Sequence, residues 1–340
     1  MPLELLTSMG FFAGGAVLLL LGGDLLVKGA VALAERHGVP PITIGLTLMA
    51  FGTSAPELAL NVAASLGGAT ALTFGNMTGS SLANTGLVLG LAALARPVKV
   101  CSSLLRRELP VLLGSVLLLL ALSCLPGHPG ADGQPGLSRA DGVVLLAVFL
   151  GFVGMMLRAA RQPAKVGATY AEDAEEVVRR EPLLSWRRAS AMVVGGLVLL
   201  GLGGKLGEVG AVGAAQALGM SQQLIGLTVV SLATTLPELI TSLLAVRRGQ
   251  TDMALGNIVG SNIFNLLFIL GTASVIATVP LPEGGTLILL GLLGFTLLLF
   301  PLSISFDWTI TRPEGLLVLA LYLAFMAWQL WMGVSTGVRP

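Results

Sequence analysis

The sequence predicts an all-α polytopic membrane protein whose ten transmembrane helices form two inverted five-helix repeats. Three observations support this prediction. The chain of 340 residues is 54% hydrophobic and only 11% charged, with a mean hydropathy of +0.90. Its apolar residues gather in ten segments of membrane-spanning length. The second half of the sequence also repeats motifs of the first half at a constant offset along the chain.

The composition excludes an ordinary soluble domain, in which about 25% of the residues are charged. A net charge of +1 gives no indication of a nucleic-acid partner. With two histidines and two cysteines, the chain offers no His/Cys metal cluster. The N-terminal stretch MPLELLTSMG lacks the positive charge of a cleavable signal, so the first apolar segment is expected to remain as a helix.

The ten apolar segments are separated by connections that carry glycine, proline and charge. Each segment is about long enough to cross the hydrocarbon core, some with tilt. They cover residues 9–34, 41–66, 71–95, 103–125, 140–160, 190–216, 221–246, 252–278, 285–305 and 313–333. The charged connection at 161–187 is expected to be a solvated linker rather than an ion sensor, because it lacks the aspartate spacing of an EF-hand.

The distribution of basic residues predicts the orientation of the chain. Fifteen of the 19 Lys and Arg residues fall in connections on one side of the predicted membrane. The opposite side, which includes both termini, carries only Arg139 and Arg339, and two lysines lie within helices. By the positive-inside rule, both termini are expected outside and the 161–187 connection in the cytoplasm.

The internal repeat is visible without any gap. The stretch IGLTLMAFGTSAPEL at 44–58 aligns with IGLTVVSLATTLPEL at 225–239. The stretch GNMTGSSLANTGLVLG at 75–90 aligns with GNIVGSNIFNLLFILG at 256–271. Chance matches of Leu and Gly are common in membrane proteins, but matched Thr, Pro, Glu, Asn and Ser at fixed spacing are not.

The repeat divides the chain into a first five-helix unit at 1–160, the connection at 161–187 and a second five-helix unit at 188–340. The duplicated motifs occupy about 42–90 and 223–271. Five helices per unit is an odd number, so the second unit enters the membrane from the other side. Inverted repeats of this kind are typical of alternating-access transporters, which bind their substrate near the midplane where the two units meet.

Each repeat places a proline directly before a glutamate, at Pro56–Glu57 and at Pro237–Glu238. Proline has no N–H, so the carbonyls one turn earlier are expected to lack their usual helical partner and to need a ligand or water. Neighbouring residues add further oxygen atoms. Four pairs at i,i+4 spacing each share a helix face: Thr53 with Glu57, Ser80 with Asn84, Thr234 with Glu238, and Ser261 with Asn265.

Carboxylates, hydroxyls, amide oxygens and carbonyls are the ligands that Ca²⁺ and Na⁺ prefer. Two glutamates at one depth of the membrane would be costly without a counter-charge. One divalent cation neutralises both, and so do two or three monovalent cations. Mutually exclusive neutralisation of one acidic site is a physical basis for exchange.

The alternative is that the motif glutamates are structural acids paired with lysines. No basic residue lies within reach on their own segments. In contrast, Asp24 with Lys28 and Lys205 with Glu208 have the spacing of pairs that satisfy each other within one helix, and we expect a structural role for them.

The duplicated motifs GTSAPE with GNMTGSSLAN, and ATTLPE with GNIVGSNIFN, resemble the two α-repeats of the sodium/calcium exchanger branch of the cation/Ca²⁺ antiporter superfamily, prokaryotic type. The resemblance implies four ion sites between helices 2, 3, 7 and 8. It implies Glu57 and Glu238 as shared Ca²⁺ carboxylates, and backbone carbonyls of Ala50 and Ser231 as additional ligands. The other side chains that it implies as ligands are Thr53, Ser54, Ser80, Asn84, Thr234, Thr235, Ser261 and Asn265.

The resemblance also implies that helices 1 and 6, whose sequences LGGDLLVKGA and LGGKLGEVGA are rich in glycine, slide across the other eight. One departure concerns Asn265, where some relatives, including the K⁺-dependent branch, carry Asp. With an amide instead of a carboxylate at this position, the site has one negative charge fewer than in those relatives, so K⁺ dependence is not expected.

We therefore expect an electrogenic antiporter in a prokaryotic inner membrane that uses Na⁺ entry to extrude Ca²⁺, and not an enzyme. A proton-coupled Ca²⁺ antiporter on the same fold is the first alternative, since burial could favour the neutral form of both glutamates in an ion-free site. An intramembrane phosphatase or protease is a distant alternative, because no Arg at membrane depth and no base for a nucleophile is present. A channel is a further alternative, though paired acids in an inverted repeat are more typical of a carrier.

No cofactor is expected, because the ions are substrates. The expected partners are membrane lipid, Ca²⁺ and Na⁺, with no nucleic acid, and a monomer is the expected state.

Overall fold

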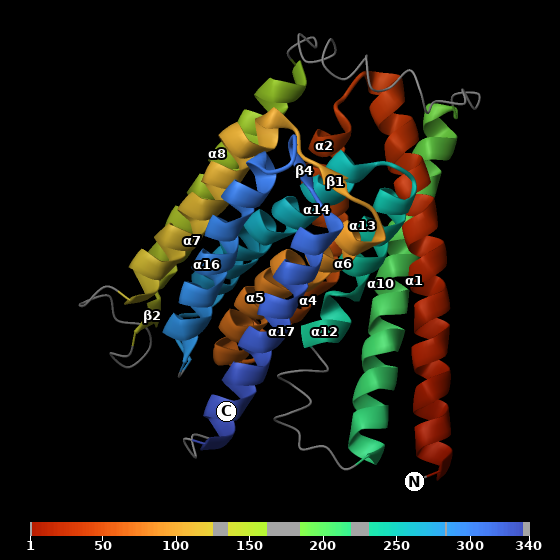
Figure 1. Ribbon diagram of the computed structural model, residues 1–340. Coiled ribbons are helices and arrows are strands. Elements are labelled where there is room, and N and C mark those ends of the chain that lie inside the picture. The colour runs from red at the N-terminus through yellow and green to blue at the C-terminus, as the bar shows by residue number, and fades with distance from the viewer. Residues whose placement is uncertain (1, 125–134, 162–183, 219–230, 283, 336–340) are drawn as a thin grey trace.

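The computed structural model describes residues 2–124, 135–161, 184–218, 231–282 and 284–335. These residues are mostly helical, as predicted (Figure 1). The first half contains α1 (Pro2–His37), α2 (Pro41–Ile44), η1 (Gly45–Met49), α3 (Ala50–Thr53), α4 (Ala55–Leu66), α5 (Thr70–Ala83), η2 (Asn84–Val88), α6 (Leu89–Ala95), β1 (Val98–Lys99), η3 (Leu104–Glu108), α7 (Leu109–Cys124), β2 (Gly136–Leu137) and α8 (Arg139–Arg161). The η elements are π-helical turns that continue the adjoining α-helices.

The second half follows the same order of elements. It contains α10 (Trp186–Ala217), α12 (Ser231–Thr234), α13 (Leu236–Arg247), α14 (Thr251–Ile263), η6 (Phe264–Ile269), α15 (Leu270–Ile276), β3 (Val279–Pro280), α16 (Gly285–Ile304), β4 (Thr309–Ile310) and α17 (Arg312–Ser335). Most of the predicted 161–187 connection, and the start of the predicted 221–246 segment, lie outside the described residues.

Within the described residues, six helices are long and apolar enough to cross a membrane, and a bent pair of helices makes a seventh candidate. Large apolar side chains point outward along these helices, for example Leu150 on α8 and Val198 on α10. A lipid environment accounts for this exposure, since such surfaces are costly in water. The chain is a multi-pass membrane protein, and the count of ten spans stays a prediction.

Backbone irregularities recur at positions that the sequence repeat aligns. Ser54 interrupts the first motif with φ −88° and ψ 5°, and Thr235 interrupts the second with φ −85° and ψ −6°. Gly68 and Gly249, which the repeat also aligns, both have a left-handed φ, of 81° and 78°. The sequence repeat therefore specifies the same local breaks in each half.

The two halves interlock rather than forming separate lobes. The short strand β1 pairs with β4 from the other half, and β2 pairs with β3. In the same way α6 packs against α17, and α15 packs against α8. The elements that carry the motifs lie at the centre of this arrangement: the spans at Leu72–Ala95 and Thr251–Ile276 are 78% and 83% buried, against 28% for α8 and α10.

The helices α1 and α10 form a long antiparallel pair at one side of the molecule (Figure 1). Their contact depends on glycine. A Cβ atom added to Gly15 would lie 2.5 Å from the backbone nitrogen of Gly207, and one added to Gly22 would lie 2.8 Å from the carbonyl oxygen of Gly196. The two backbones therefore approach as closely as in small-residue packing of membrane helices.

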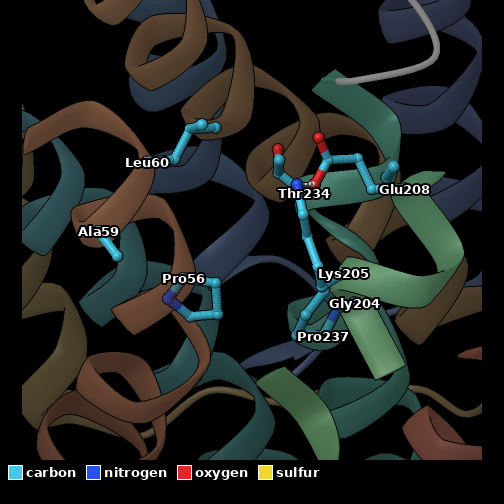
Figure 2. A pocket seen from close by; sticks show the side chains of 9 residues that line it. Pro56, Ala59, Leu60, Gly204, Lys205, Glu208, Thr234 and Pro237 are labelled. Atoms are coloured by element: carbon cyan, nitrogen blue, oxygen red, sulfur yellow. Dashed lines mark hydrogen bonds and ion pairs between the residues drawn. The ribbon is translucent and has the colours of Figure 1, made fainter. Parts of the chain in front are cut away.

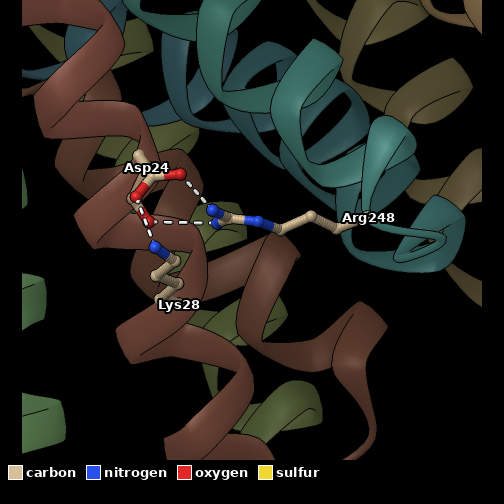
Figure 3. Close-up of polar contacts among 3 residues, drawn as sticks. All are labelled: Asp24, Lys28 and Arg248. Atoms are coloured by element: carbon tan, nitrogen blue, oxygen red, sulfur yellow. Dashed lines mark hydrogen bonds and ion pairs between the residues drawn. The ribbon is translucent and has the colours of Figure 1, made fainter. Parts of the chain in front are cut away.

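A three-residue ion network ties α1 to the rest of the protein (Figure 3). Lys28 Nζ lies 2.8 Å from Asp24 Oδ2, which is the pair predicted from the sequence. Arg248, at the end of α13, is a second partner of Asp24: it pairs with the carboxylate and donates to the Asp24 carbonyl at 3.1 Å. The expectation that this pair is satisfied within one helix is therefore incomplete, because Asp24 also holds α1 against α13.

Candidate ion-binding site

Each motif proline begins a new helix. The helix α3 ends at Thr53 and α4 begins at Ala55, and the helical segment Pro41–Thr53 is bent by 46° relative to Ala55–Leu66. Pro56 lies at the start of α4, where the missing N–H costs no helical hydrogen bond. The second motif has the same arrangement: Thr235 is the cap of α13, and Pro237 lies in the first turn of that helix.

The prolines thereby place each glutamate in the first turn of a half-helix. Glu57 is in the first turn of α4 and Glu238 is in the first turn of α13. The amide groups at a helix N-terminus favour negative charge, and they support these carboxylates away from water. Both side chains are only 1% exposed.

The two glutamates belong to one site. Ser54 Oγ, from the first half, donates a hydrogen bond to Glu238 Oε1, from the second half, at 2.9 Å. Thr53 also lies beside the Glu238 carboxylate. Ser54 is the cap residue at the start of α4, and Glu57 lies in the first turn of that helix, so the Ser54 bond brings Glu238 to the helix end that carries Glu57. The interlocking of the halves thus brings together two acids that lie far apart in the sequence.

Six buried oxygens of the predicted ligand set lack a hydrogen-bond partner. They form three pairs related by the repeat: Glu57 Oε2 with Glu238 Oε2, Ser80 Oγ with Ser261 Oγ, and Asn84 Oδ1 with Asn265 Oδ1. All six residues are at most 1% exposed. Burying such oxygens unpaired is costly, and a cation would supply the missing partner. Hydroxyls without a partner also occur elsewhere, for example at Ser123. The six oxygens differ from these because they occur at positions that the repeat aligns in both halves.

Both amides lie at π-helical turns. Asn84 begins η2, and Asn265 lies within η6 at the equivalent place in the second half. Single π-turns inside α-helices are frequently found at functional sites, because they rotate side chains out of the regular helical register. This local geometry was not predicted from the sequence.

The remaining predicted residues are more varied. The Ala50 carbonyl accepts the Ser54 amide at 3.1 Å and lies 3.4 Å from Thr53 Oγ1, so it already has protein partners. Thr235 is buried, whereas Thr234 is partly exposed and lines a cavity. Ser231 begins α12, and its side chain lies outside what the structure describes.

Sequence reasoning missed Asn257 on α14. Its Nδ2 donates to Thr241 Oγ1 at 3.3 Å and to Ser242 Oγ at 3.0 Å, and its Oδ1 lies 3.4 Å from Thr53 Oγ1. Asn257 therefore positions Thr53 and links the second half to the first. The repeat alignment contained the signal, because Asn76 occupies the equivalent place in GNMTGSSLAN.

The fold and these oxygen clusters are those of a multi-pass transporter for hard cations. The family model described as sodium/calcium exchanger protein matches residues 7–158 and 189–331. The chain belongs to the sodium/calcium exchanger family and is a cation/Ca²⁺ antiporter.

Individual relatives cover nearly the whole chain. The putative antiporter CaxA of Alkalimonas amylolytica is 35% identical, over 94% of this chain and 98% of its own length. The sodium/calcium exchanger MaX1 of Methanosarcina acetivorans is 30% identical, over 92% and 95%. A structure of the sodium-calcium exchanger NCX_Mj, soaked with Na⁺ and Sr²⁺, superposes with a TM-score of 0.79 at 32% identity, over 95% of this chain and 98% of that one.

Proposed function

We propose that this protein exchanges Na⁺ for Ca²⁺ by alternating access, with Na⁺ entry driving Ca²⁺ out of the cell. The observation that carries the proposal is the site shared by the two halves, in which Ser54 binds Glu238 and three repeat-related pairs of buried oxygens lack partners. Two carboxylates among neutral oxygens favour hard cations. The similarity to MaX1 and NCX_Mj, which are both sodium/calcium exchangers, supports Na⁺ as the coupling ion.

In this mechanism Glu57 and Glu238 together hold Ca²⁺. Two or three Na⁺ ions replace it, using the hydroxyls and amides of Ser80, Asn84 and their repeat equivalents. Thr53, Ser54, Thr234 and Thr235, with the carbonyls of Ala50 and Ser231, complete the proposed ligand sets. Occupancy by either ion removes most of the charge of the site, and an empty site keeps a buried charge of about −2. The protein without a bound ion therefore changes slowly between its outward-open and inward-open states. Movement of one ion is in this way coupled to movement of the other.

The proposed moving part is the pair α1 and α10, in a fold of ten helices built as two inverted repeats. The glycine contacts between α1 and α10 hold these two helices together as one unit. Toward α13, Gly23 faces Ile240 and Gly204 faces Pro237, so the surface of the pair is low there, and Asp24 with Arg248 is a charged link between α1 and the rest. Sliding of this pair would open the site to one side of the membrane and then to the other.

The proposed orientation places both termini outside and the 161–187 connection in the cytoplasm. The start of α1 and the end of α17 lie at one end of the molecule, and the end of α8 and the start of α10 lie at the other (Figure 1). This arrangement agrees with the distribution of basic residues, which favours the α8–α10 end as the cytoplasmic one.

The test is uptake of ⁴⁵Ca²⁺ into proteoliposomes at clamped pH, driven by an outward Na⁺ gradient. The expected result is uptake that requires Na⁺ inside. Acceleration by a negative potential on the Na⁺-receiving side would assign three Na⁺ per Ca²⁺, because exchange of two Na⁺ for one Ca²⁺ moves no net charge. Uptake that follows a pH gradient and ignores Na⁺ would instead assign proton coupling and overturn the proposal.

A further inference from the structure

A cavity of about 280 Å³ lies beside the two motif prolines, between the broken helices and α10 (Figure 2). Its wall brings together both halves of the site. The residues that carry the argument are Pro56, Gly204, Lys205, Glu208, Thr234 and Pro237. Since Pro56 and Pro237 directly precede Glu57 and Glu238 in the chain, the cavity reaches the start of both site-bearing half-helices.

The cavity contains two charges that no proposed ligand set uses. Lys205 Nζ lies 3.0 Å from Glu208 Oε2, and the two residues are separated by one turn of α10. Figure 2 shows the Lys205 side chain extending along the cavity toward Glu208 and Thr234. Lys205 is 66% exposed and Glu208 is 21% exposed, and both line the cavity.

Charged side chains in the middle of a membrane helix are costly, and they are generally found where they line a water-filled path. Lys205 and Glu208 lie well inside the 32-residue helix α10. The residue equivalent to Lys205 in the first half is Asp24, which is instead bound by Lys28 and Arg248. The lysine–glutamate pair at the cavity is therefore a local departure from the repeat, and packing of α1 with α10 does not require it.

We propose that Glu208 is an approach site for hydrated Na⁺ and Ca²⁺ on the path to the paired glutamates, and that the Lys205 ammonium occupies this carboxylate until an ion displaces it. The proposal rests on the proposed function, because it assigns a route to that same site. The helix α12, which carries the cavity residues Ala233 and Thr234, lies toward the end of the molecule where α1 starts and α17 ends (Figure 1), and we place the mouth of the route at that face.

The pair then acts as a charge filter. The Glu208 carboxylate attracts a cation as the cation leaves bulk water, and this attraction raises the local concentration of cations at the cavity. Lys205 keeps the cavity close to neutral when no ion is present, and it lowers the affinity of the approach site so that ions do not remain there. Removal of Glu208 should weaken ion capture from this face alone, and removal of Lys205 should strengthen it.

The first experiment measures the electrostatic potential of the cavity without using transport. Ala59, an exposed residue of the cavity wall, is changed to cysteine in a background carrying Cys101→Ser and Cys124→Ser. Its reaction rates with a cationic and an anionic methanethiosulfonate reagent are compared in the full chain in liposomes. The ratio of cationic to anionic rate should fall several-fold with Glu208→Gln and rise several-fold with Lys205→Gln.

The matched control is Lys28→Gln on α1, which removes a lysine of a similar helix pair outside the cavity and leaves Asp24 bound by Arg248. The rate ratio should not change in this variant. Monodisperse elution in detergent reports folding, and the Lys205→Gln variant decides the outcome by itself if Glu208→Gln does not fold. An unchanged ratio in Lys205→Gln would overturn the proposal.

The second experiment measures half-saturating Ca²⁺ separately at each face, in right-side-out and inside-out vesicles. At the face that carries the termini, Glu208→Gln should raise the half-saturating Ca²⁺ concentration and Lys205→Gln should lower it, each by about threefold or more. Neither variant should change this concentration at the other face. Equal changes at both faces would contradict an approach site. Should wild type lack Na⁺-driven uptake while the labelling ratios shift as expected, the proposed exchange fails and the cavity assignment stands.

Discussion

The Ser54 hydroxyl donates a hydrogen bond to the Glu238 carboxylate at 2.9 Å, across 184 positions of sequence. This bond joins the break in the first motif to the acid of the second. It leaves Glu238 Oε2 without a partner, as Glu57 Oε2 is in the same buried site. The relationship predicts that residues of both halves contribute to every ion-bound state.

Removal of either acid should abolish Ca²⁺ binding. Glu57→Gln or Glu238→Gln leaves one carboxylate, which cannot balance a divalent cation in a dry site. Isothermal calorimetry should detect no Ca²⁺ binding in either variant, and vesicle uptake should fall to background. The control is Glu35→Gln at the exposed end of α1, which should bind as wild type does. Wild-type rates in both site variants would remove the glutamates from the site.

Loss of the cross-half hydrogen bond should weaken binding without abolishing it. Hydrogen bonds to charged groups contribute roughly 1.5–3 kcal/mol, so Ser54→Ala should raise the Ca²⁺ dissociation constant by about tenfold or more. Calorimetry again gives the measurement. The control is Ser115→Ala, which removes a hydroxyl bound only to the Val111 carbonyl on α7 and should leave the affinity unchanged. An unchanged affinity in Ser54→Ala would mean that the bond is absent when the ion is bound.

The close contact between α1 and α10 can be tested by changing Gly15, with the adjacent Gly14 as the control. A Cβ atom added to Gly15 would lie 2.5 Å from the backbone nitrogen of Gly207, whereas one added to Gly14 would meet no atom within 4 Å. Gly15→Leu should therefore separate the helices and slow exchange strongly, with a lower melting temperature in detergent. Gly14→Leu should change neither quantity. Equal behaviour of the two variants would contradict a closely packed α1–α10 pair as the moving unit.

The Asp24–Arg248 link should resist movement of α1. Arg248→Gln removes both the ion pair and the hydrogen bond to the Asp24 carbonyl, while Lys28 still neutralises the carboxylate. We expect the maximal exchange rate to rise several-fold with little change in Ca²⁺ affinity, because the site itself is untouched. The neighbouring Arg247 is exposed, and Arg247→Gln is the control. A slower rate in Arg248→Gln would indicate that the link supports the moving state instead.

The sequence alone was sufficient to predict a helical membrane protein and its exchanger family, whereas the ligand set of its site stays a prediction. The internal repeat and the two Pro–Glu pairs are local patterns, and local patterns fix where a helix breaks and which side chains share a face. The recurrence of the same backbone angles at Ser54 and Thr235 follows from this local chemistry.

The tertiary structure alone decided which groups meet across the two halves. Helical periodicity contains no information on distances between segments, so it could not predict that Ser54 would bind Glu238 or that Asn257 would position Thr53. It likewise classed Asp24 with Lys28, and Lys205 with Glu208, as equivalent pairs. Packing separated them: Arg248 from another helix binds Asp24, while a cavity beside the motif prolines opens onto Lys205 and Glu208.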